Sequence, residues 1–538
     1  MWAASIFFLY HRKFLRISYD TKTLRRDARA NAEETKYGRE RKRRMEWIER
    51  INGLINGWVW GPPMLVLMGV VGVLMTLRTG VFQISHFGHW MKKTIGSIFK
   101  NKEVTAHTQD KSISQFQSLC TALAATVGTG NIVGVAGAIA TGGPGAVFWM
   151  WFMALFGMMT NYSENVLGIF YRKKNAAGEW SGGAMYYLHY GLGAKKHCRA
   201  VGTFLAGLFS VFCFLASFGI GNMTQVNSIS SNMKSAFGLP SWVTGLIIMV
   251  AVGVVVLGGL KRIAAVTEKI VPFMVVLYIV GSVVILVTHV TAVPAIFGAI
   301  FKGAFGVKAV GGGIVGFGLK QAVVMGMKRG VFSNEAGLGS SVMVHSNSNV
   351  EEPVRQGMWG IFEVFADTIV VCTLTAVSIL ASGDIDLVTG KVASGVEASN
   401  LASAAFGAMF GKAGEMFIAV AILLFAFSTV LGWSHYGSKA CEYLLGLKAT
   451  VVYKAVFTLA TFGGAVMGQN LAWDIADTLN GLMAIPNLIG VLALSGTVAA
   501  ITKNYTDRTF RGKKIRPMLS AYEDIQAQQE KSLAARSE

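Results

Sequence analysis

Two polar, glycine-containing segments interrupt apolar runs that are each long enough to cross a membrane. The first is Thr121–Ile132 and the second is Phe332–Gly339. Irregular backbone has no partners for its N–H and C=O groups in hydrocarbon, so it persists only where it is buried or lines a polar cavity. Two such breaks in corresponding places are typical of transporters built from inverted repeats, with the binding site between the repeats. We therefore expect a binding site where these segments meet.

The breaks offer suitable chemistry for both ends of an amino-acid zwitterion. A half-helix that starts after Gly130 directs free N–H groups and the positive end of its dipole at a carboxylate. A half-helix that ends near Phe332 leaves carbonyl groups free to accept from an ammonium group. Glycine at 128 and 130 lets a ligand approach the backbone closely. A small zwitterion is the predicted ligand class.

The hydroxyl pair Ser428–Thr429 lies in a later apolar run and offers oxygen ligands to a hard cation. Sodium binds several such oxygens, which unwound backbone and hydroxyl groups supply together. Serine and threonine in membrane helices also commonly bond back to their own helix. The pair therefore indicates a sodium site only in combination with the first broken helix.

Glu164 and Glu335 are ionisable groups within apolar runs, where charge is costly and by default suggests function. Either residue could carry a proton. Glu335 could instead cap a half-helix that begins at Ala336, and Glu164 could bond to unwound backbone of a neighbouring helix. We favour these two structural roles over proton coupling.

The composition predicts an all-α polytopic membrane protein. Of 538 residues, 53% are hydrophobic, 14% are charged and 63 are glycine. The apolar runs predict about eleven transmembrane helices of roughly twenty residues each. They are 60–77, 116–141, 146–171, 200–227, 243–259 and 268–288 in the first half, and 318–345, 358–382, 412–436, 450–467 and 471–501 in the second.

The formal net charge of +20 comes from basic clusters between the apolar runs and at both ends of the chain. Such clusters hold loops on the cytoplasmic side, so they indicate membrane topology rather than nucleic-acid binding. The basic tail 503–538 then places the carboxyl terminus in the cytoplasm, and an odd number of helices places the amino terminus outside. The likewise basic segment 12–44 conflicts with that placement.

Two explanations fit the amino-terminal segment. In the first, the functional chain begins at Met45 and residues 1–44 are an extension outside it; in the second, the segment is a basic arm that rests on anionic lipid. We favour the first. The expected organisation is then 1–44 as an extension, 45–502 as the transmembrane domain with inverted repeats at 113–290 and 310–502, and 503–538 as a cytoplasmic tail.

Other function classes find less support. Histidine and cysteine residues are dispersed, without a zinc motif or a catalytic arrangement, so we expect neither an enzyme nor a cofactor other than a coupling ion. A channel needs a continuous hydrated path, whereas discontinuous helices indicate alternating access. A helical pattern with short loops predicts the inner or plasma membrane of a prokaryote-like cell. The sequence gives no indication of oligomeric state.

Four segments together resemble the alanine or glycine:cation symporter family. They are Ala125–Asn131, Gly182–Leu188, Arg329–Gly337 and Phe427–Ser434. The resemblance implies a LeuT-type core of five-plus-five inverted helices preceded by one extra helix, and sodium-driven uptake of small neutral amino acids such as alanine and glycine. Ala184 stands where the family pattern leads us to expect proline, in a cytoplasmic segment that bears on gating more than on substrate choice.

The resemblance also implies the residues of both sites. For sodium it implies the hydroxyl groups of Ser428 and Thr429 with the carbonyl groups of Ala124, Val127 and Phe425. Proton coupling in the same fold and another neutral amino acid such as glutamine remain alternatives. The implied substrate contacts, of which we expect most from Asn131 and Gln225, are Thr129, Gly130, Asn131, Gln225, Phe332, Ser333 and Trp433.

Overall fold

The computed structural model describes residues 46–108, 111–306, 312–387, 390–393, 400–467 and 469–535. The predicted extension 1–44 lies outside these residues. The chain forms two compact units, Met1–Gly57 and Trp58–Glu538. In the first unit the described residues, 46–57, are helical. The second unit carries every candidate site residue.

The described elements of the second unit are helices and one short antiparallel hairpin, in which β1 (Lys173–Lys174) pairs with β2 (Trp180–Ser181). In chain order the helices are α2 (Pro62–Arg78), α3 (Phe82–Ser85), α4 (Phe87–Lys93), α5 (Ile95–Ile98), α6 (Lys102–Thr105), α7 (Gln115–Thr126), η1 (Gly130–Gly134), α8 (Val135–Gly142), α9 (Gly145–Phe170), α10 (Ala184–Tyr186), η2 (Tyr187–Leu192), α11 (Arg199–Phe218), η3 (Gly219–Met223), α12 (Thr224–Phe237), α13 (Ser241–Val256), α14 (Gly259–Thr288), η4 (Val290–Ala292), α15 (Val293–Ala304), α16 (Gly312–Asn334), α17 (Val342–His345), α18 (Pro353–Val364), η5 (Phe365–Cys372), α19 (Thr373–Ala381), α20 (Leu401–Phe410), α21 (Lys412–Leu445), α22 (Ala449–Val466), α23 (Gln469–Ala493), α24 (Ser495–Arg511) and α25 (Glu523–Ala535).

Several long helices expose large apolar side chains at the protein surface. Examples are Leu246 on α13, Val280 on α14 and Val451 on α22. Contiguous apolar surface of this kind is unstable in water and stable against lipid. The helices are therefore built to lie in a bilayer.

Seven helices among the described residues are long and apolar enough to span a membrane, or eight if the bent pair α7 and α8 is one span. The count of about eleven stays a prediction. α9 is absent from those seven because its second half buries the polar residues Asn161, Glu164 and Asn165 in the protein interior. A helix that lines a polar interior is less apolar than one that faces lipid.

Both predicted breaks are present. The axes of α7 and of the helix over 130–142 differ by 49°. α16 ends at Asn334, and Glu335, Gly337 and Gly339 then have positive φ before α17 starts. Positive φ is incompatible with a continuing right-handed helix and favours glycine.

Several predicted spans have different ends in the structure. The run predicted as one helix over 471–501 is divided at Leu494, where α23 ends and α24 begins. The run predicted over 200–227 continues through η3 to Phe237. A tight turn and a π-helical turn leave no strong signal in the apolar pattern alone.

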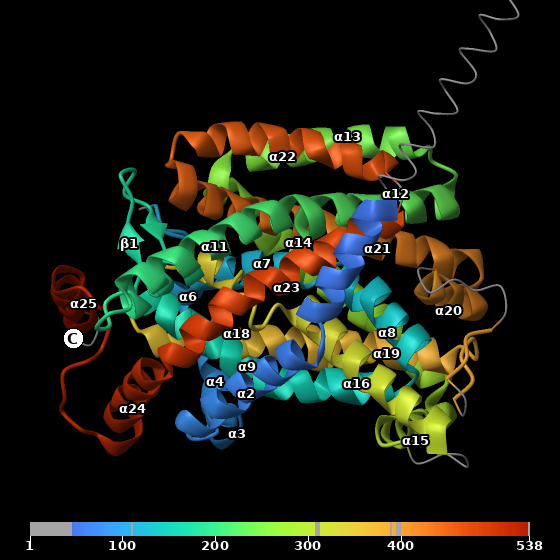
Figure 1. Cartoon of the computed structure of the whole chain (residues 1–538), viewed down its shortest axis with the longest axis horizontal. Helices are drawn as coiled ribbons and strands as arrows, with labels where there is room; N and C mark the ends of the chain where they lie inside the picture. Colours follow the sequence, from blue (N-terminus) through green and yellow to red (C-terminus); the bar gives the residue numbers. More distant parts are fainter. Residues whose placement is uncertain are drawn as a thin grey trace, which may run out of the picture. The chain divides into compact units, whose positions relative to one another are not determined.

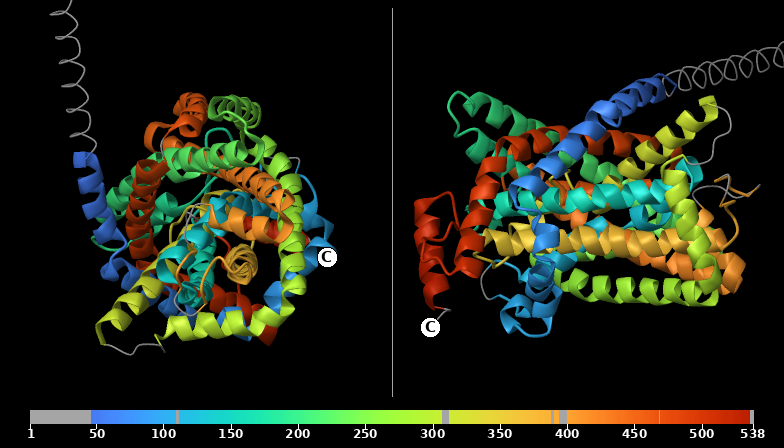
Figure 2. Two further views of the ribbon diagram at one scale, coloured as in Figure 1. Left: turned by 90° about the vertical axis from the view of Figure 1, so that its right-hand side faces the viewer. Right: turned by 90° about the horizontal axis from the view of Figure 1, so that it is seen from below.

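The broken helices lie among helices from both halves of the chain. α9 packs against α16 and α18, while α21 packs against α7, α11, α12 and α14. In the right-hand view of Figure 2 the long helices run along a common direction. Figure 1 shows α24 and α25 at one end of the unit and α15 and α20 at the other. The breaks therefore lie between these ends.

Candidate functional site

The first break is held by polar side chains that bond to its backbone. The Gly128 N–H donates to Asn131 Oδ1 at 2.9 Å, so Asn131 folds back onto the unwound turn. On α12, Gln225 Oε1 accepts from the Thr129 hydroxyl at 2.9 Å and from the Thr129 N–H at 3.3 Å. All of these side chains are buried. The structure thus brings together Thr129, Asn131 and Gln225, as expected for a polar site at the break.

A buried carboxylate joins the first break to the second. Asp367 on η5 accepts from Asn131 Nδ2 at 2.6 Å and from the Ser333 hydroxyl at 2.9 Å. The hydroxyl of the adjacent Thr368 also donates to Asp367, at 2.7 Å. Asp367 is not among the residues predicted from the sequence. It lies within a predicted span, so the rule that selected Glu164 and Glu335 applies to it equally.

The two breaks approach each other closely at Gly130. A Cβ atom added there would lie 3.3 Å from Phe332 Cδ1 and 3.3 Å from Ser333 Cα. The Phe332 ring stacks on Trp473 of α23, with 5.9 Å between ring centroids. A side chain at 130 would therefore require Phe332 and Ser333 to shift by a few tenths of an ångström. The Phe332 ring covers one side of this glycine.

Trp433 lies inside the protein. It is fully buried on α21, and its Nε1 donates to Glu335 Oε1 at 2.8 Å. The contact of Trp433 with the substrate stays a prediction. Its hydrogen bond to Glu335 connects α21 to the second break.

Glu335 does not cap a half-helix that begins at Ala336. The helix after the break begins at Val342, and the Ala336 N–H is bonded by Asn334 Oδ1 at 3.0 Å. Glu335 instead accepts from Trp433 and from the Ser340 hydroxyl, the latter at 2.6 Å. The prediction placed the half-helix too early because the positive φ values extend the unwound segment.

Glu164 supports the unwound backbone through a neighbour. Asn487 of α23 donates from Nδ2 both to Glu164 Oε1 and to the carbonyl oxygen of Gly337, the latter at 2.9 Å. Glu164 is thus connected to the unwound segment through Asn487, and its expected structural role stays a prediction.

Four of the five predicted sodium ligands lie together where α7 meets α21, namely Ala124 of α7 and Phe425, Ser428 and Thr429 of α21. The Thr429 hydroxyl lies 3.0 Å from the Ala124 carbonyl oxygen and 3.0 Å from that of Phe425. The Ser428 hydroxyl lies 3.4 Å and 2.8 Å from the same two oxygens. Val127 follows directly where α7 ends. These hydroxyls therefore bond within their own helix and also reach across to α7, and the buried set of hard oxygens fits sodium.

A buried polar site between two broken membrane helices is typical of a secondary transporter. The sequence model of the sodium:alanine symporter family matches residues 45–518, and the chain belongs to this family. It is thus a transporter rather than an enzyme.

Several known proteins are similar to this chain. The "Sodium/alanine symporter AgcS" of Methanococcus maripaludis is 43% identical over 463 residues, which cover 86% of this chain and 98% of that protein. The "Probable sodium/glutamine symporter GlnT" of Bacillus subtilis is 36% identical, over 87% of this chain and 92% of that protein. The structure of MhsT in complex with L-phenylalanine aligns with a TM-score of 0.46 and 16% identity, over 74% of this chain and 90% of that one.

Gly128→Ala is expected to raise the sodium concentration for half-maximal transport by about tenfold. The added Cβ would lie 2.4 Å from Thr429 Oγ1 and would displace it. Overpacking of this kind costs about 1–3 kcal/mol, and about 1.4 kcal/mol corresponds to a tenfold change in an equilibrium constant. Sodium titration of substrate uptake measures this shift. Gly137→Ala on α8 is the control, because no atom lies within 4 Å of its added Cβ. Equal sodium titrations for the two variants would contradict the prediction.

Proposed function

We propose that the protein is a sodium-coupled symporter that imports small neutral amino acids, alanine and glycine, by alternating access. The observation that carries this proposal is that one broken helix serves both sites. The Ala124 carbonyl group meets Thr429, while Gly128, Thr129 and Asn131 form the polar site one turn further on. Family membership and the name of the 43% identical relative support the same assignment.

The geometry suits a small zwitterion. The N–H groups of Gly128 and Thr129 bond to the side-chain oxygens of Asn131 and Gln225 in this structure, and they can bind a substrate carboxylate that displaces those oxygens. The Asp367 carboxylate beside Ser333 provides negative charge for an ammonium group. The close approach of Gly130 to Phe332 leaves little room for a long side chain. This favours alanine and glycine over glutamine, the substrate named for one relative.

The architecture that best accounts for these contacts is the LeuT-type arrangement of about eleven spans. In it α2 is the extra helix, the elements from α7 to α14 form the first repeat, and those from α16 to α23 form the second. Each repeat starts with its broken helix, and the next helices along the chain, α9 and α18, pack against each other.

The topology follows from charge. The basic residues of α24 lie at the same end as the β1 hairpin with Lys173 and Lys174. By the positive-inside rule this end is cytoplasmic, with the carboxyl terminus inside and the amino terminus outside the inner membrane.

Polar contacts on both sides of the site are suited to act as gates. On the α15 side, Lys328 Nζ lies 2.7 Å from Asp477 Oδ2 and so joins α16 to α23. On the cytoplasmic side, Lys439 Nζ of α21 donates to Ser181 of the hairpin at 3.0 Å. Alternating access requires each connection to break in turn.

A sodium gradient is sufficient to drive this transport. One sodium ion that moves down about 100 mV yields roughly 2.3 kcal/mol, and a tenfold concentration gradient adds about 1.4 kcal/mol. The sum supports an accumulation of a neutral solute of about 500-fold.

Proteoliposomes with an inward sodium gradient are expected to accumulate radiolabelled alanine, and Asn131→Ala is expected to lose nearly all of this uptake. Asn131 bonds both to the unwound turn and to Asp367, so loss of its side chain removes the hydrogen bonds that hold the first break against η5. Competition by unlabelled glycine and glutamine tests the substrate range. Equal uptake driven by a pH gradient without sodium, or no alanine uptake by the unaltered protein, would contradict the proposed function.

Thr429→Val is expected to weaken sodium dependence by about tenfold or more while the protein stays folded. Valine keeps the shape but removes the hydroxyl that meets the Ala124 carbonyl group, and one hydrogen bond of this kind contributes about 1 kcal/mol or more. Thr461→Val is the matched control, since this buried threonine of α22 bonds only within its own helix in the described contacts. The prediction fails if both variants show the sodium response of the unaltered protein.

A further inference from the structure

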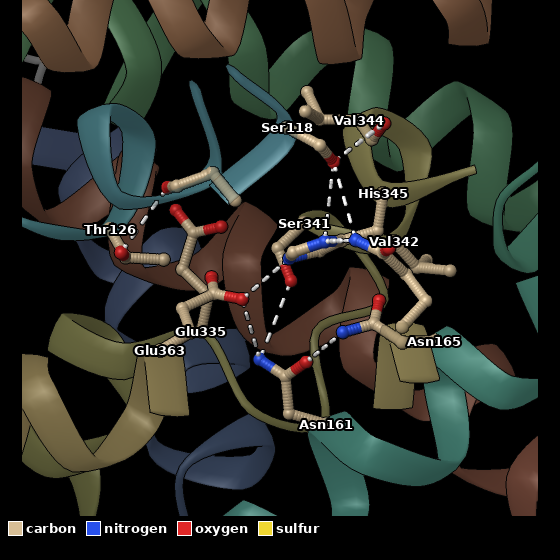
Figure 3. Close-up of polar contacts among 12 residues, drawn as sticks. Ser118, Thr126, Asn161, Asn165, Glu335, Ser341, Val342, Val344, His345 and Glu363 are labelled. Atoms are coloured by element: carbon tan, nitrogen blue, oxygen red, sulfur yellow. Dashed lines mark hydrogen bonds and ion pairs between the residues drawn. The ribbon is translucent and has the colours of Figure 1, made fainter. Parts of the chain in front are cut away.

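The buried carboxyl group of Glu363 lies outside the proposed substrate and sodium sites, at the centre of another polar network. Glu363 on α18 is fully buried. Its Oε2 accepts from His345 Nε2 of α17 at 2.9 Å and from Asn161 Nδ2 of α9 at 3.4 Å. Figure 3 shows these contacts. Its other oxygen, Oε1, has no hydrogen-bond partner among the described residues.

The surroundings of His345 fix the orientation of its ring. Its Nδ1 accepts from Gln356 Nε2 and faces the Ser118 hydroxyl at 3.4 Å. The Gln356 amide is oriented by its other end, because its Oε1 accepts from the Ser348 hydroxyl at 2.9 Å. With Nδ1 facing the Gln356 amide, Nε2 is the ring nitrogen that donates to Glu363. His345 therefore orients the Glu363 carboxyl group.

The other groups that face Glu363 are acidic or neutral. Glu335 lies within electrostatic range, and Figure 3 shows the two carboxyl groups near each other. Glu164 and Asp367 are also within range. From α21 the Tyr436 hydroxyl is close, buried and without a partner among the described residues.

The basic side chains on the neighbouring helices interact with groups other than Glu363. Arg508 of α24 pairs with Glu352, which precedes α18, at 2.8 Å. Lys93 and His89 of α4 interact with Arg355, in the first turn of α18. His89 lies outside the spanning helices, and burial with nearby Lys93 lowers its pKa to about 4, so it is neutral at pH 7. Among the described residues, Glu363 has no lysine or arginine ion pair.

We propose that Glu363 is a proton-binding site of this transporter, with the proton on Oε1. A buried carboxylate that faces a second one needs a positive charge or a proton, since two close carboxylates cannot both ionise in a medium of low polarity. Glu335 accepts from Trp433 and Ser340 with its two oxygens, whereas Glu363 has one oxygen free to carry hydrogen.

The network connects this proton to the moving parts. His345 belongs to the helix after the second break, Ser118 belongs to α7, and Asn161 also faces the Ser341 hydroxyl at 3.4 Å. Movement of either broken helix changes the surroundings of Glu363 and therefore its affinity for the proton. By linkage, protonation then changes the equilibrium between conformations. The part of this inference that concerns transport rests on the proposed function, whereas the protonation itself does not.

Infrared spectroscopy of the purified protein tests the protonation without any transport assay. At neutral pH the unaltered protein is expected to show the carbonyl band of a buried carboxylic acid, shifted in D₂O, and Glu363→Gln is expected to lose a one-carboxyl share of it. Glu363→Asp retains a carboxyl group and is expected to keep that share. Glu415→Gln on α21, where the side chain is partly exposed, is the matched control. An unchanged band in folded Glu363→Gln would overturn the proposal.

The pH dependence of transport tests the linkage. With the sodium gradient fixed and the internal and external pH kept equal, the half-saturating alanine concentration of the unaltered protein is expected to change by up to about tenfold per pH unit. Glu363→Gln is expected to remove this dependence while sodium-driven uptake continues. A pH profile that is the same in both proteins would overturn the linkage. Absence of alanine uptake in the unaltered protein would overturn the proposed function instead, and the infrared result would still stand.

Discussion

The structure depends on one constraint, which is that backbone groups released by a broken helix must find partners inside the bilayer. Gly128 and Thr129 find them in Asn131 and Gln225, and the Gly337 carbonyl group finds one in Asn487. Each partner makes a second bond, Asn131 to Asp367, Gln225 to the Ile220 carbonyl oxygen and Asn487 to Glu164, and so ties the break to another element.

The same constraint explains how one short segment can serve two ligands. At the end of α7 the Ala124 carbonyl group meets the hydroxyl of Thr429, and the following turn meets Gln225 and Asp367 through its own residues. Any ion that binds between α7 and α21 fixes the position of that turn, and any zwitterion that binds the turn fixes the position of α7. The coupling of sodium binding to zwitterion binding therefore needs no structural element besides α7 and the turn that follows it.

The parts of the site that depend on local pattern were predictable from the sequence. The two breaks have signals in residue type and spacing. The choice of Gln225 and the approach of Ser428 and Thr429 to α7 were implied by the resemblance to the family, and the bond between Thr129 and Gln225 was not predicted. Asp367 was missed although its burial cost was foreseeable, and its partner Asn131 lies 236 residues away, beyond any spacing rule. The prediction of a half-helix that starts at Ala336 was wrong because turns with positive φ leave the apolar pattern almost unchanged. The prediction of one undivided helix over 471–501 was wrong because a short interruption has equally little effect on that pattern.

The most direct test of the coupling is the reciprocity of sodium and alanine binding to the purified protein, measured by calorimetric titration of each ligand with and without the other. If α7 joins the two sites, sodium raises the affinity for alanine, and alanine raises the affinity for sodium by the same factor. We predict a factor of about five or more, which corresponds to a coupling free energy of about 1 kcal/mol. Equal alanine affinity in sodium and in potassium would contradict the central claim.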